Sequence, residues 1–334
     1  MLKSINLSLS STCGADCIFC PSDRGQRIKQ KIMPFEYVER IINELSSEEF
    51  KKHHNVIKIS TGENGDAFLN KDLIKILRLI RSRLSRIKIG FATNFQNFTK
   101  DKVETILNEK LIDELSCNID SFDKEVYYEI KKIDFYNTMS NLMYFLMVRK
   151  RLNCYLPLNI NVVSYNDYIK AIYYNFGIKP VKIKECIKTT ETFCDIEFIL
   201  KKIINSTDKI NRLGIRGWAE RKQPKKVNYR KYVCKEIKRI KNEAFIAPDG
   251  TWYACCWDSN NELVLGNVMK QSINEIFYSE KRKRFIQMLK NKEFEKISGP
   301  CKTVNCCQRL KKSDLETIWQ IFLNFITKIK NILN

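Results

Sequence analysis

Two kinds of hydrophobic pattern alternate along roughly the first 213 residues of the chain. Short apolar runs predict buried strands over residues 4–11, 56–60, 87–93, 114–119, 156–163 and 181–185. Between them, apolar residues recur every three or four positions, which predicts helices over about 38–45, 73–84, 100–110, 135–150, 165–175 and 195–211. Strand–helix alternation of this kind is typical of a parallel sheet with right-handed crossovers. We therefore expect residues 1–213 to form an α/β domain.

The pattern changes in the last third of the chain. Glycine, proline and a basic run break the alternation over 214–233, which predicts a linker. Residues 245–255 predict a β-hairpin with an Asp249–Gly250 turn. The segment Leu265-Gly-Asn-Val268 and helices near 273–278 and 283–289 follow the hairpin. We therefore expect a second, small α+β domain over 234–310.

The C-terminal segment, 311–334, predicts an amphipathic helix. It begins with the capping box Ser313–Glu316 and continues as a wide apolar stripe. Docking on the protein's own body is the favoured interpretation, and a partner protein or a membrane surface is the alternative. No run of about 18 apolar residues predicts a transmembrane segment. Residues 1–12 lack the sections of a signal peptide, so we expect a cytoplasmic location.

Thirteen cysteines are the most informative feature of the composition. Without a secretory signal, clustered cysteines favour metal ligands over a disulfide framework. Cys13, Cys17 and Cys20 lie on one short segment after the first predicted strand. Three thiolates on one tight loop can hold three irons of a [4Fe–4S] cubane and leave the fourth iron open. Zinc, the main alternative, prefers four ligands, usually as two pairs, and no partner pair lies nearby.

The segment Cys13-Gly-Ala-Asp-Cys17-Ile-Phe-Cys20 resembles the CxxxCx-aromatic-C signature of the radical S-adenosylmethionine (SAM) superfamily. The resemblance implies a partial (β/α)6 radical SAM barrel over 1–213. It implies a SAM-binding [4Fe–4S] cluster on these three cysteines, whose reduction cleaves SAM to a 5′-deoxyadenosyl radical. It also implies a reductant such as flavodoxin or ferredoxin.

The same resemblance indicates a loop that contacts SAM. Gly65-Asp66 matches the Gly-Glu of a Gly-Gly-Glu-Pro-like segment after the second strand, with Ala67 in place of proline. The acidic side chain would bind the SAM amino group. A shifted register would give this role to Glu63 instead.

Asparagines near two strand ends complete the predicted SAM site, and two more are predicted to face the lumen. Asn94 follows the third strand, and Asn118 stands near the end of the fourth, where the family usually has serine. The resemblance implies that both contact the ribose or carboxylate of SAM. Asn159 and Asn161 alternate with apolar residues in the fifth strand, so their amides could turn into the barrel lumen.

A second set of cysteines predicts an auxiliary metal site. Cys234, Cys255, Cys301 and Cys306 can converge on a tetrahedral S4 site, which suits both iron–sulfur clusters and zinc. The Gly-x4-Cys at 250–255 and the Leu-Gly-Asn at 265–267 resemble the twitch or SPASM domain of radical SAM enzymes. The number of cysteines suits the shortened twitch with one [4Fe–4S] cluster. The neighbouring Cys256 and Cys307 remain alternative ligands.

Charge and histidine content narrow the choice of function only slightly. The 59 Lys and Arg against 38 Asp and Glu give a formal net charge of +21. These cations are spread along the chain, which favours general lysine richness over a polyanionic partner or substrate. The two histidines, His53 and His54, predict a solvated loop, which argues against histidine-based catalysis.

These features together predict a radical SAM oxidoreductase or modifying enzyme. It would abstract a hydrogen atom from a small molecule such as a sugar or aminocyclitol, and the auxiliary cluster favours a net dehydrogenation. The alternatives are a peptide maturase, an RNA modifier favoured by charge alone, and a non-catalytic iron–sulfur or zinc protein. No residue of the sequence identifies the substrate.

Overall fold

The computed structural model describes residues 1–17, 20, 31–62, 65–163, 199–213, 232–258, 260–303 and 308–309. Its central element is a run of parallel strands: β1 (Ser4–Leu7), β2 (Lys58–Thr61), β3 (Lys88–Thr93), β4 (Glu114–Asp120), β5 (Leu158–Val163) and β6 (Lys209–Leu213). Each pairs in parallel with the next strand in chain order. This arrangement confirms the predicted α/β fold with a parallel sheet.

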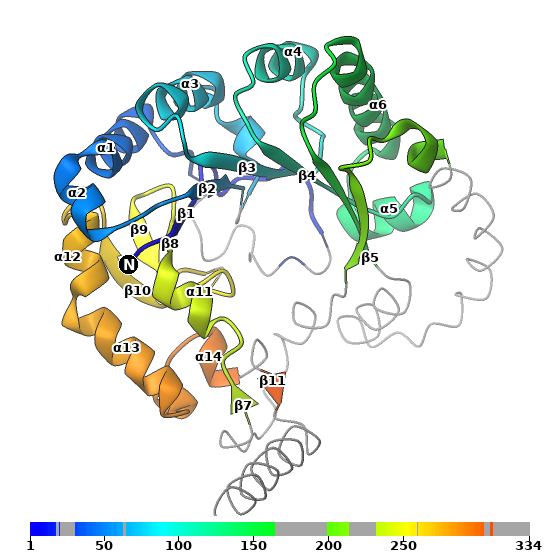
Figure 1. Cartoon of the computed structure of the whole chain (residues 1–334). Coiled ribbons are helices and arrows are strands. Elements are labelled where there is room, and N and C mark those ends of the chain that lie inside the picture. The colour runs from blue at the N-terminus through cyan, green and yellow to red at the C-terminus, as the bar shows by residue number, and fades with distance from the viewer. Residues whose placement is uncertain are drawn as a thin grey trace, which may run out of the picture.

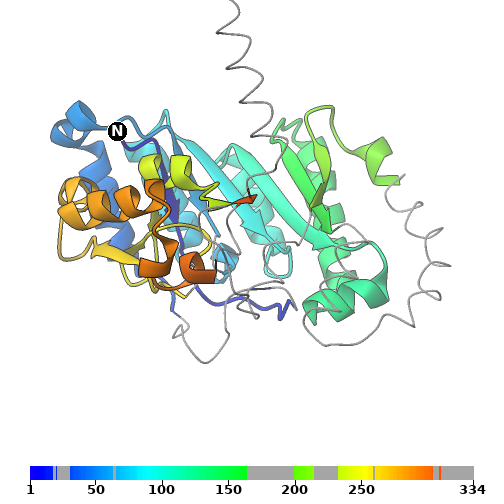
Figure 2. The ribbon, with the colours of Figure 1, turned by 90° about the horizontal axis from the view of Figure 1, so that it is seen from below.

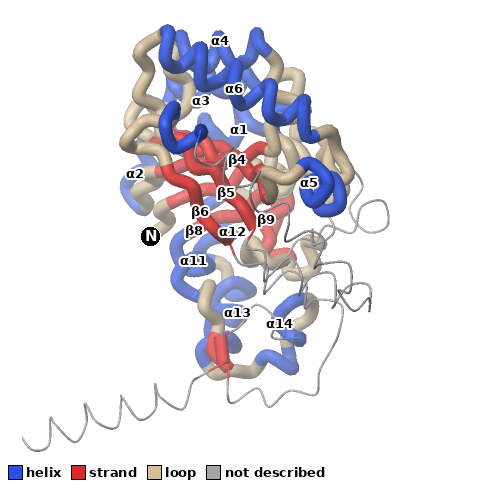
Figure 3. Tube along the Cα trace, turned by 90° about the vertical axis from the view of Figure 1, so that its right-hand side faces the viewer, coloured by secondary structure: helices blue, strands red, loops and turns tan. Residues whose placement is uncertain are grey.

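Helices cover the outer side of this curved sheet. They are α1 (Phe35–Ser46), α3 (Leu73–Arg83), α4 (Lys100–Asn108) and α6 (Phe135–Arg151), which follow one another along the arc in Figure 1. In α1 the predicted apolar positions Val38, Ile41, Ile42 and Leu45 are all buried. Figure 3 shows α3, α4 and α6 as one layer over the strands. The outer face of the sheet and the inner faces of these helices therefore form the core.

The opposite face of the sheet is more polar. In β4, Leu115 and Cys117 are fully buried, whereas the alternating Ser116 and Asn118 are half-buried. The same alternation continues in β5, where Asn159 and Asn161 are half-buried between buried aliphatic residues. Since successive side chains of a strand point to opposite faces, the polar set lies on the concave face, away from the helices. The described middle of the barrel lumen along β4 and β5 is thus lined with the neutral polar groups Ser116, Asn118, Asn159 and Asn161.

The predicted helix over 195–211 is partly wrong. The described part is helical over 199–203, and the chain then forms β6, which pairs with β5 through Asn159↔Lys209 and the following residues. The buried carboxylate of Asp208 explains the change of structure. It forms a bidentate ion pair with Arg149 of α6, at 2.8 and 2.6 Å, and accepts from the backbone N–H of Leu158. These bonds fix the chain beside β5 where the helix would have continued.

The C-terminal region extends the same sheet beyond β1. It contains β7 (Tyr232–Val233), α11 (Ile237–Asn242), β8 (Glu243–Ile246), β9 (Thr251–Tyr253) and β10 (Val264–Asn267). Strand β8 pairs in parallel with β1, and β9 and β10 follow in antiparallel pairing. Gly250 has φ of +80° in the β8–β9 turn, a conformation that suits glycine, so the predicted hairpin is confirmed.

Short helices complete this region: α12 (Ile273–Tyr278), α13 (Glu280–Lys290), the 3₁₀ helix η5 (Phe294–Lys296) and α14 (Pro300–Thr303). Strand β11 (Gln308–Arg309) pairs with β7. Figure 2 shows these helices (orange) beside the β1 side of the sheet, opposite α6 (green).

The prediction of a solvated histidine loop is wrong for His54. A short helix, α2 (Glu48–His53), precedes it. The sequence analysis predicted neither α2 nor another helix, α5 (Lys124–Lys131). The His54 ring is buried against Phe50, Phe277 and Tyr278, with ring centroids 4.6 to 5.7 Å away. Its Nδ1 accepts from the backbone N–H of Leu2. The imidazole is therefore a packing element between α2 and α12.

Several predicted segments lie outside the described residues. They are the strand at 181–185, the helix at 165–175, all but the last two residues of the linker at 214–233, and the C-terminal helix within 311–334. Among the residues that the structure describes, no helix is long and apolar enough to cross a membrane. The division into domains at 213 and 234 remains a prediction.

Candidate functional site

The segment bearing the first three cysteines lies at the carboxyl end of β1. Cys13, Cys17 and Cys20 are all half-buried. The backbone N–H of Cys20 donates to the carbonyl of Cys17 at 3.0 Å, which links these two cysteines. Because active groups of parallel α/β sheets gather at the carboxyl ends of strands, this edge is the candidate site.

Two glycines let the loop after β2 pack directly against its neighbours. A Cβ on Gly65 would lie 2.7 Å from the carbonyl oxygen of Thr12 and even closer to that of Ser10. Gly62 has φ of +92°, and a Cβ there would lie 2.6 Å from the carbonyl oxygen of Ala92 in β3. Glycine is required at both positions because backbone occupies the space of a side chain. Gly65 thus lets the loop after β2 pack against the backbone of the segment that leads to Cys13. Glu63 lies outside the described residues.

The side chain of Asp66 is turned inward. It is 1% exposed, and its carboxylate accepts from the Phe68 N–H at 3.0 Å, the Asn97 amide at 3.1 Å and the Thr93 hydroxyl at 3.4 Å. Burial raises the pKa of this carboxyl group, although these three donors oppose the increase. Its backbone N–H donates to the carbonyl of Thr12 at 2.9 Å. The geometry therefore supports a positioning role for Asp66, and its direct contact with the SAM amino group stays a prediction.

Asn94 lies directly against the cysteine segment. Its side-chain Nδ2 is 3.7 Å from the sulfur of Cys13, within hydrogen-bonding range for a sulfur acceptor. Its Oδ1 accepts from the backbone N–H of Gln96 at 2.9 Å, which fixes the orientation of the amide. The backbone carbonyl of Asn94 accepts from Thr138 of α6. The structure thus brings Asn94 to the first cysteine.

A buried ion pair is the feature of this site that sequence reasoning missed. Asp120, the last residue of β4, has φ of +66° and pairs with Lys131 of α5 at 2.7 Å. Both side chains are less than 10% exposed. Burial raises the pKa of the Cys17 thiol to about 11, and Lys131 is the strongest opposing influence. The only signal in the sequence is an acidic residue at a strand end, which does not reveal its partner.

Asn118 joins a row of amides across three adjacent strands. The amide of Asn161 donates to Asn118 Oδ1 at 2.8 Å, and Asn211 donates to Asn161 Oδ1 at 3.1 Å. The register places the three residues side by side on β4, β5 and β6. They present a neutral, polar surface to the lumen.

The C-terminal cysteines are buried where they are described. Cys234, Cys255 and Cys301 are 8%, 3% and 2% exposed, whereas Cys256 is half-buried and its sulfur accepts from Arg239 at 3.1 Å. Cys306 and Cys307 lie outside the described residues. The deeper burial of Cys255 favours it over Cys256 as a ligand, and the choice between Cys306 and Cys307 stays open.

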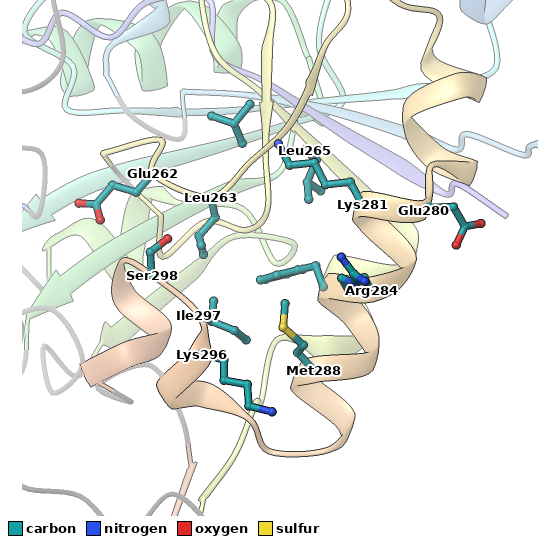
Figure 4. A pocket seen from close by; sticks show the side chains of 12 residues that line it. Glu262, Leu263, Leu265, Glu280, Lys281, Arg284, Met288, Lys296, Ile297 and Ser298 are labelled. Atoms are coloured by element: carbon teal, nitrogen blue, oxygen red, sulfur yellow. The ribbon is translucent and has the colours of Figure 1, made fainter.

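A groove of about 760 Å³ lies elsewhere in the C-terminal region. Figure 4 shows it between α13, η5 and the segment leading into β10, with the side chains of Leu263, Arg284, Met288 and Ile297 around it. None of the candidate site residues lines it, so it does not belong to this site.

Comparison with known proteins defines the class of the chain. Residues 7–203 match the model of the radical SAM superfamily, and residues 234–308 match that of an iron–sulfur cluster-binding domain, SPASM. The first match spans more than half of the chain. The chain therefore belongs to the radical SAM superfamily and carries a C-terminal SPASM domain. These domains imply a SAM-binding [4Fe–4S] cluster, auxiliary iron–sulfur binding and SAM.

Individual relatives are more distant. A probable GTP 3′,8-cyclase of Methanococcus aeolicus is 30% identical over 132 residues, which are 39% of this chain and 41% of that relative. BtrN in complex with AdoMet and 2-DOIA has a TM-score of 0.53 at 16% identity and covers 93% of this chain and 94% of its own. Streptococcus suis SuiB bound to S-adenosylmethionine has a TM-score of 0.55 at 17% identity, covering 90% and 76%. Native anSMEcpe with bound AdoMet has a TM-score of 0.57 at 14% identity, covering 99% of both chains. These likenesses establish the fold.

The residues at the carboxyl end of β1 suit a cubane cluster. Among the described residues, no three cysteine, histidine or carboxylate side chains are gathered closely enough to hold a metal ion. The thiols are neighbours all the same, because Cys13 and Cys20 both act electrostatically on Cys17. The soft sulfur donors, the Asn94 amide and the buried cation of Lys131 together suit an anionic iron–sulfur cluster.

Proposed function

We propose that this protein is a radical SAM dehydrogenase of a small, hydroxyl-rich polar substrate such as a sugar or aminocyclitol. Cys13, Cys17 and Cys20 bind the catalytic cluster, which when loaded and reduced supplies the electron for SAM cleavage. The substrate would lose a hydrogen atom to the 5′-deoxyadenosyl radical, then one proton and one electron, which gives a two-electron oxidation.

One observation carries this proposal: Cys13 of the first cysteine set and Cys255 of the second lie toward opposite ends of β1. Cys13 follows the carboxyl end of β1, and β8 runs parallel to β1. Strand β9 runs antiparallel to β8, so Cys255, two residues after β9, lies toward the amino end of β1. The lumen lies between these ends. A substrate bound there could give up its hydrogen atom on one side and its electron on the other.

The chain's own residues support each part of this arrangement. The row of Asn118, Asn161 and Asn211 offers amide donors and acceptors that suit hydroxyl groups. At the amino end of the lumen, Lys58 pairs with Glu114, so these charges already have partners. The amides of the lumen therefore suit a small substrate rich in hydroxyl groups.

A series of hydrogen bonds connects Cys256, the neighbour of Cys255, with strand β1. Arg239 contacts the sulfur of Cys256 and donates to Glu243 at 3.0 Å. Glu243 in turn accepts from the amide of Asn6 in β1 at 3.1 Å. This chain of contacts supports the proposal that the SPASM cysteines Cys234, Cys255, Cys301 and Cys306 hold one auxiliary cluster close to the barrel.

The test of substrate class uses deuterium transfer. Reconstituted, reduced enzyme is incubated with SAM and a panel of perdeuterated sugars and aminocyclitols, and 5′-deoxyadenosine is examined by mass spectrometry. We expect deuterium in 5′-deoxyadenosine and, in a parallel incubation with unlabelled substrate, a product two mass units lighter than that substrate. A short peptide panel and an RNA panel serve as controls. Deuterium transfer from peptides alone would contradict the proposal and support a maturase.

The test of the auxiliary role uses a variant with Cys301, Cys306 and Cys307 replaced by alanine. This variant keeps the first cysteine segment, so it should still form 5′-deoxyadenosine slowly with a strong reductant. It should fail to form oxidised product, because the second electron acceptor is gone. Circular dichroism must show that the variant is folded. A folded variant that oxidises substrate at the wild-type rate would contradict the electron-acceptor role.

A further inference from the structure

The buried pair of Asp120 and Lys131 lies between the end of β4 and the end of α5, outside the apolar core. Lys131 is 3% exposed, so its ammonium cannot reach a ligand in the lumen. Helix α5 nevertheless ends at this residue, beside the cysteine segment. A buried lysine is costly to keep unless it has a specific electrostatic partner.

Lys131 contacts the cysteine segment in two ways. Its backbone carbonyl accepts from the N–H of Asp16 at 2.7 Å, so it holds the residue just before Cys17. Its ammonium also acts on the Cys17 sulfur through space. Burial alone would lower the pKa of Lys131, but Asp120 and then Cys17 raise it above its usual range. The lysine therefore remains a cation at this site.

The surroundings of the pair screen its charges poorly. Among the described residues, the Cys117 thiol of β4 and the Tyr127 hydroxyl of α5 also face the pair. Burial raises the pKa of each, so both stay neutral at pH 7. A cation held beside the cysteine segment therefore lies in a low-dielectric surrounding, where screening is weak.

We propose that Lys131 is a positioning and tuning residue that raises the reduction potential of the cluster bound by Cys13, Cys17 and Cys20. This inference rests on the proposed assignment of those cysteines as ligands. Reduction adds one negative charge to the cluster, and a buried cation beside a ligand sulfur stabilises the reduced form. Asp120 holds the ammonium in place and weakens its effect. The pair therefore sets how strong a reductant the enzyme needs.

The experiment is a redox titration of the reconstituted cluster without SAM, followed by electron paramagnetic resonance. The Asp120→Asn variant removes the opposing charge while the anionic sulfurs of the loaded cluster still face the ammonium, so its midpoint potential should rise. Lys131→Gln removes the cation, so its potential should fall. We expect each change to alter the equilibrium constant for reduction by about tenfold, which is about 59 mV for one electron. Opposite shifts from one ion pair would not follow from a merely structural role.

Two control variants sharpen the comparison. Lys132→Gln removes the same charge one residue further on, where the side chain is exposed and pairs with Glu129, and it should leave the potential unchanged. Lys131→Arg keeps the charge and should hold the wild-type potential within a small margin. Iron content and circular dichroism are recorded for every variant.

Three outcomes would overturn the inference. The first is an unchanged potential in both Asp120→Asn and Lys131→Gln, and the second is a shift of the same sign in both. The third is failure of both variants to hold iron, which would show that the pair builds the loop without tuning the cluster. A Cys17→Ala variant that still holds this cluster would instead refute the ligand assignment, so the two failures are distinguishable.

Discussion

Replacement of Asp66 distinguishes a positioning role from a direct contact with SAM. Its carboxylate joins the loop after β2 to Asn97 and Thr93 around the end of β3, and its N–H joins that loop to Thr12. Asp66→Ala removes the acceptor for three donors, of which the Phe68 N–H and the Thr93 hydroxyl are fully buried. Asp66→Asn keeps one carbonyl oxygen for these two donors. Rotation of the Asn97 amide would restore the third bond.

The magnitudes follow from the number of bonds lost. A buried donor left without a partner costs about 1–3 kcal/mol. The bond from the Thr93 hydroxyl is long, at 3.4 Å, so its loss is at the lower end. We expect Asp66→Ala to reduce the free energy of unfolding by about 2–4 kcal/mol, a large share of the about 5–15 kcal/mol typical of a protein. For Asp66→Asn we expect less than about 1 kcal/mol, because no buried donor is left unpaired.

The assay combines anaerobic urea unfolding, followed by circular dichroism, with SAM binding to reconstituted protein. A direct ammonium contact would make Asp66→Asn bind SAM about 10- to 150-fold more weakly, since a hydrogen bond to a charged group contributes about 1.5–3 kcal/mol. A positioning role predicts a wild-type unfolding midpoint and nearly wild-type affinity for this variant. Unchanged unfolding with 10-fold weaker SAM binding would refute our reasoning, and the parallel Glu63→Gln variant tests the other predicted contact.

Two further predictions concern cluster content and pH. The reconstituted wild-type chain should bind about eight irons, four per cubane, and replacement of Cys13, Cys17 and Cys20 together by alanine should leave about four; a wild-type value near four, with zinc present, would contradict the auxiliary cluster. Burial lowers the pKa of His54 below its ordinary value of 6.5, so the unfolded chain takes up a proton first as pH falls, and stability should decrease below about pH 6.5 by at most about 1.4 kcal/mol per pH unit. His54→Gln should flatten this decrease in thermal unfolding measured between pH 8 and 5.5, and an unchanged profile would contradict it.

The sequence predicts the repeating part of this fold well, because apolar periodicity reports directly on burial. Helix α1 and strand β5 lie where the spacing places them, since each has one buried face. The prediction failed at β6, where a strand lies within the expected helix. That strand depends on the buried pair of Arg149 and Asp208, residues far apart in sequence, which no local pattern reveals.

The candidate site, like the fold, has a part that the sequence predicts and a part that depends on tertiary packing. The spacing of Cys13, Cys17 and Cys20 identifies a ligand set, because all three lie on one loop. The inward orientation of Asp66 and the pairing of Lys131 with Asp120 could not be predicted, because both depend on how β2, β3, β4 and α5 pack together. The burial of His54 was missed for the same reason, since Phe277 and Tyr278 reach it from α12.

The most direct test of the central claim measures 5′-deoxyadenosine from SAM with anaerobically reconstituted, reduced protein. Wild-type enzyme should form it, and Cys17→Ala should not, because the cluster loses one of its three ligands. Cys117→Ala is the matched control, since this buried thiol also lies near Lys131 but is not a proposed ligand. It should retain four irons at the first site and form 5′-deoxyadenosine. Undiminished formation by Cys17→Ala, or none by wild-type protein with a full complement of iron, would contradict the account.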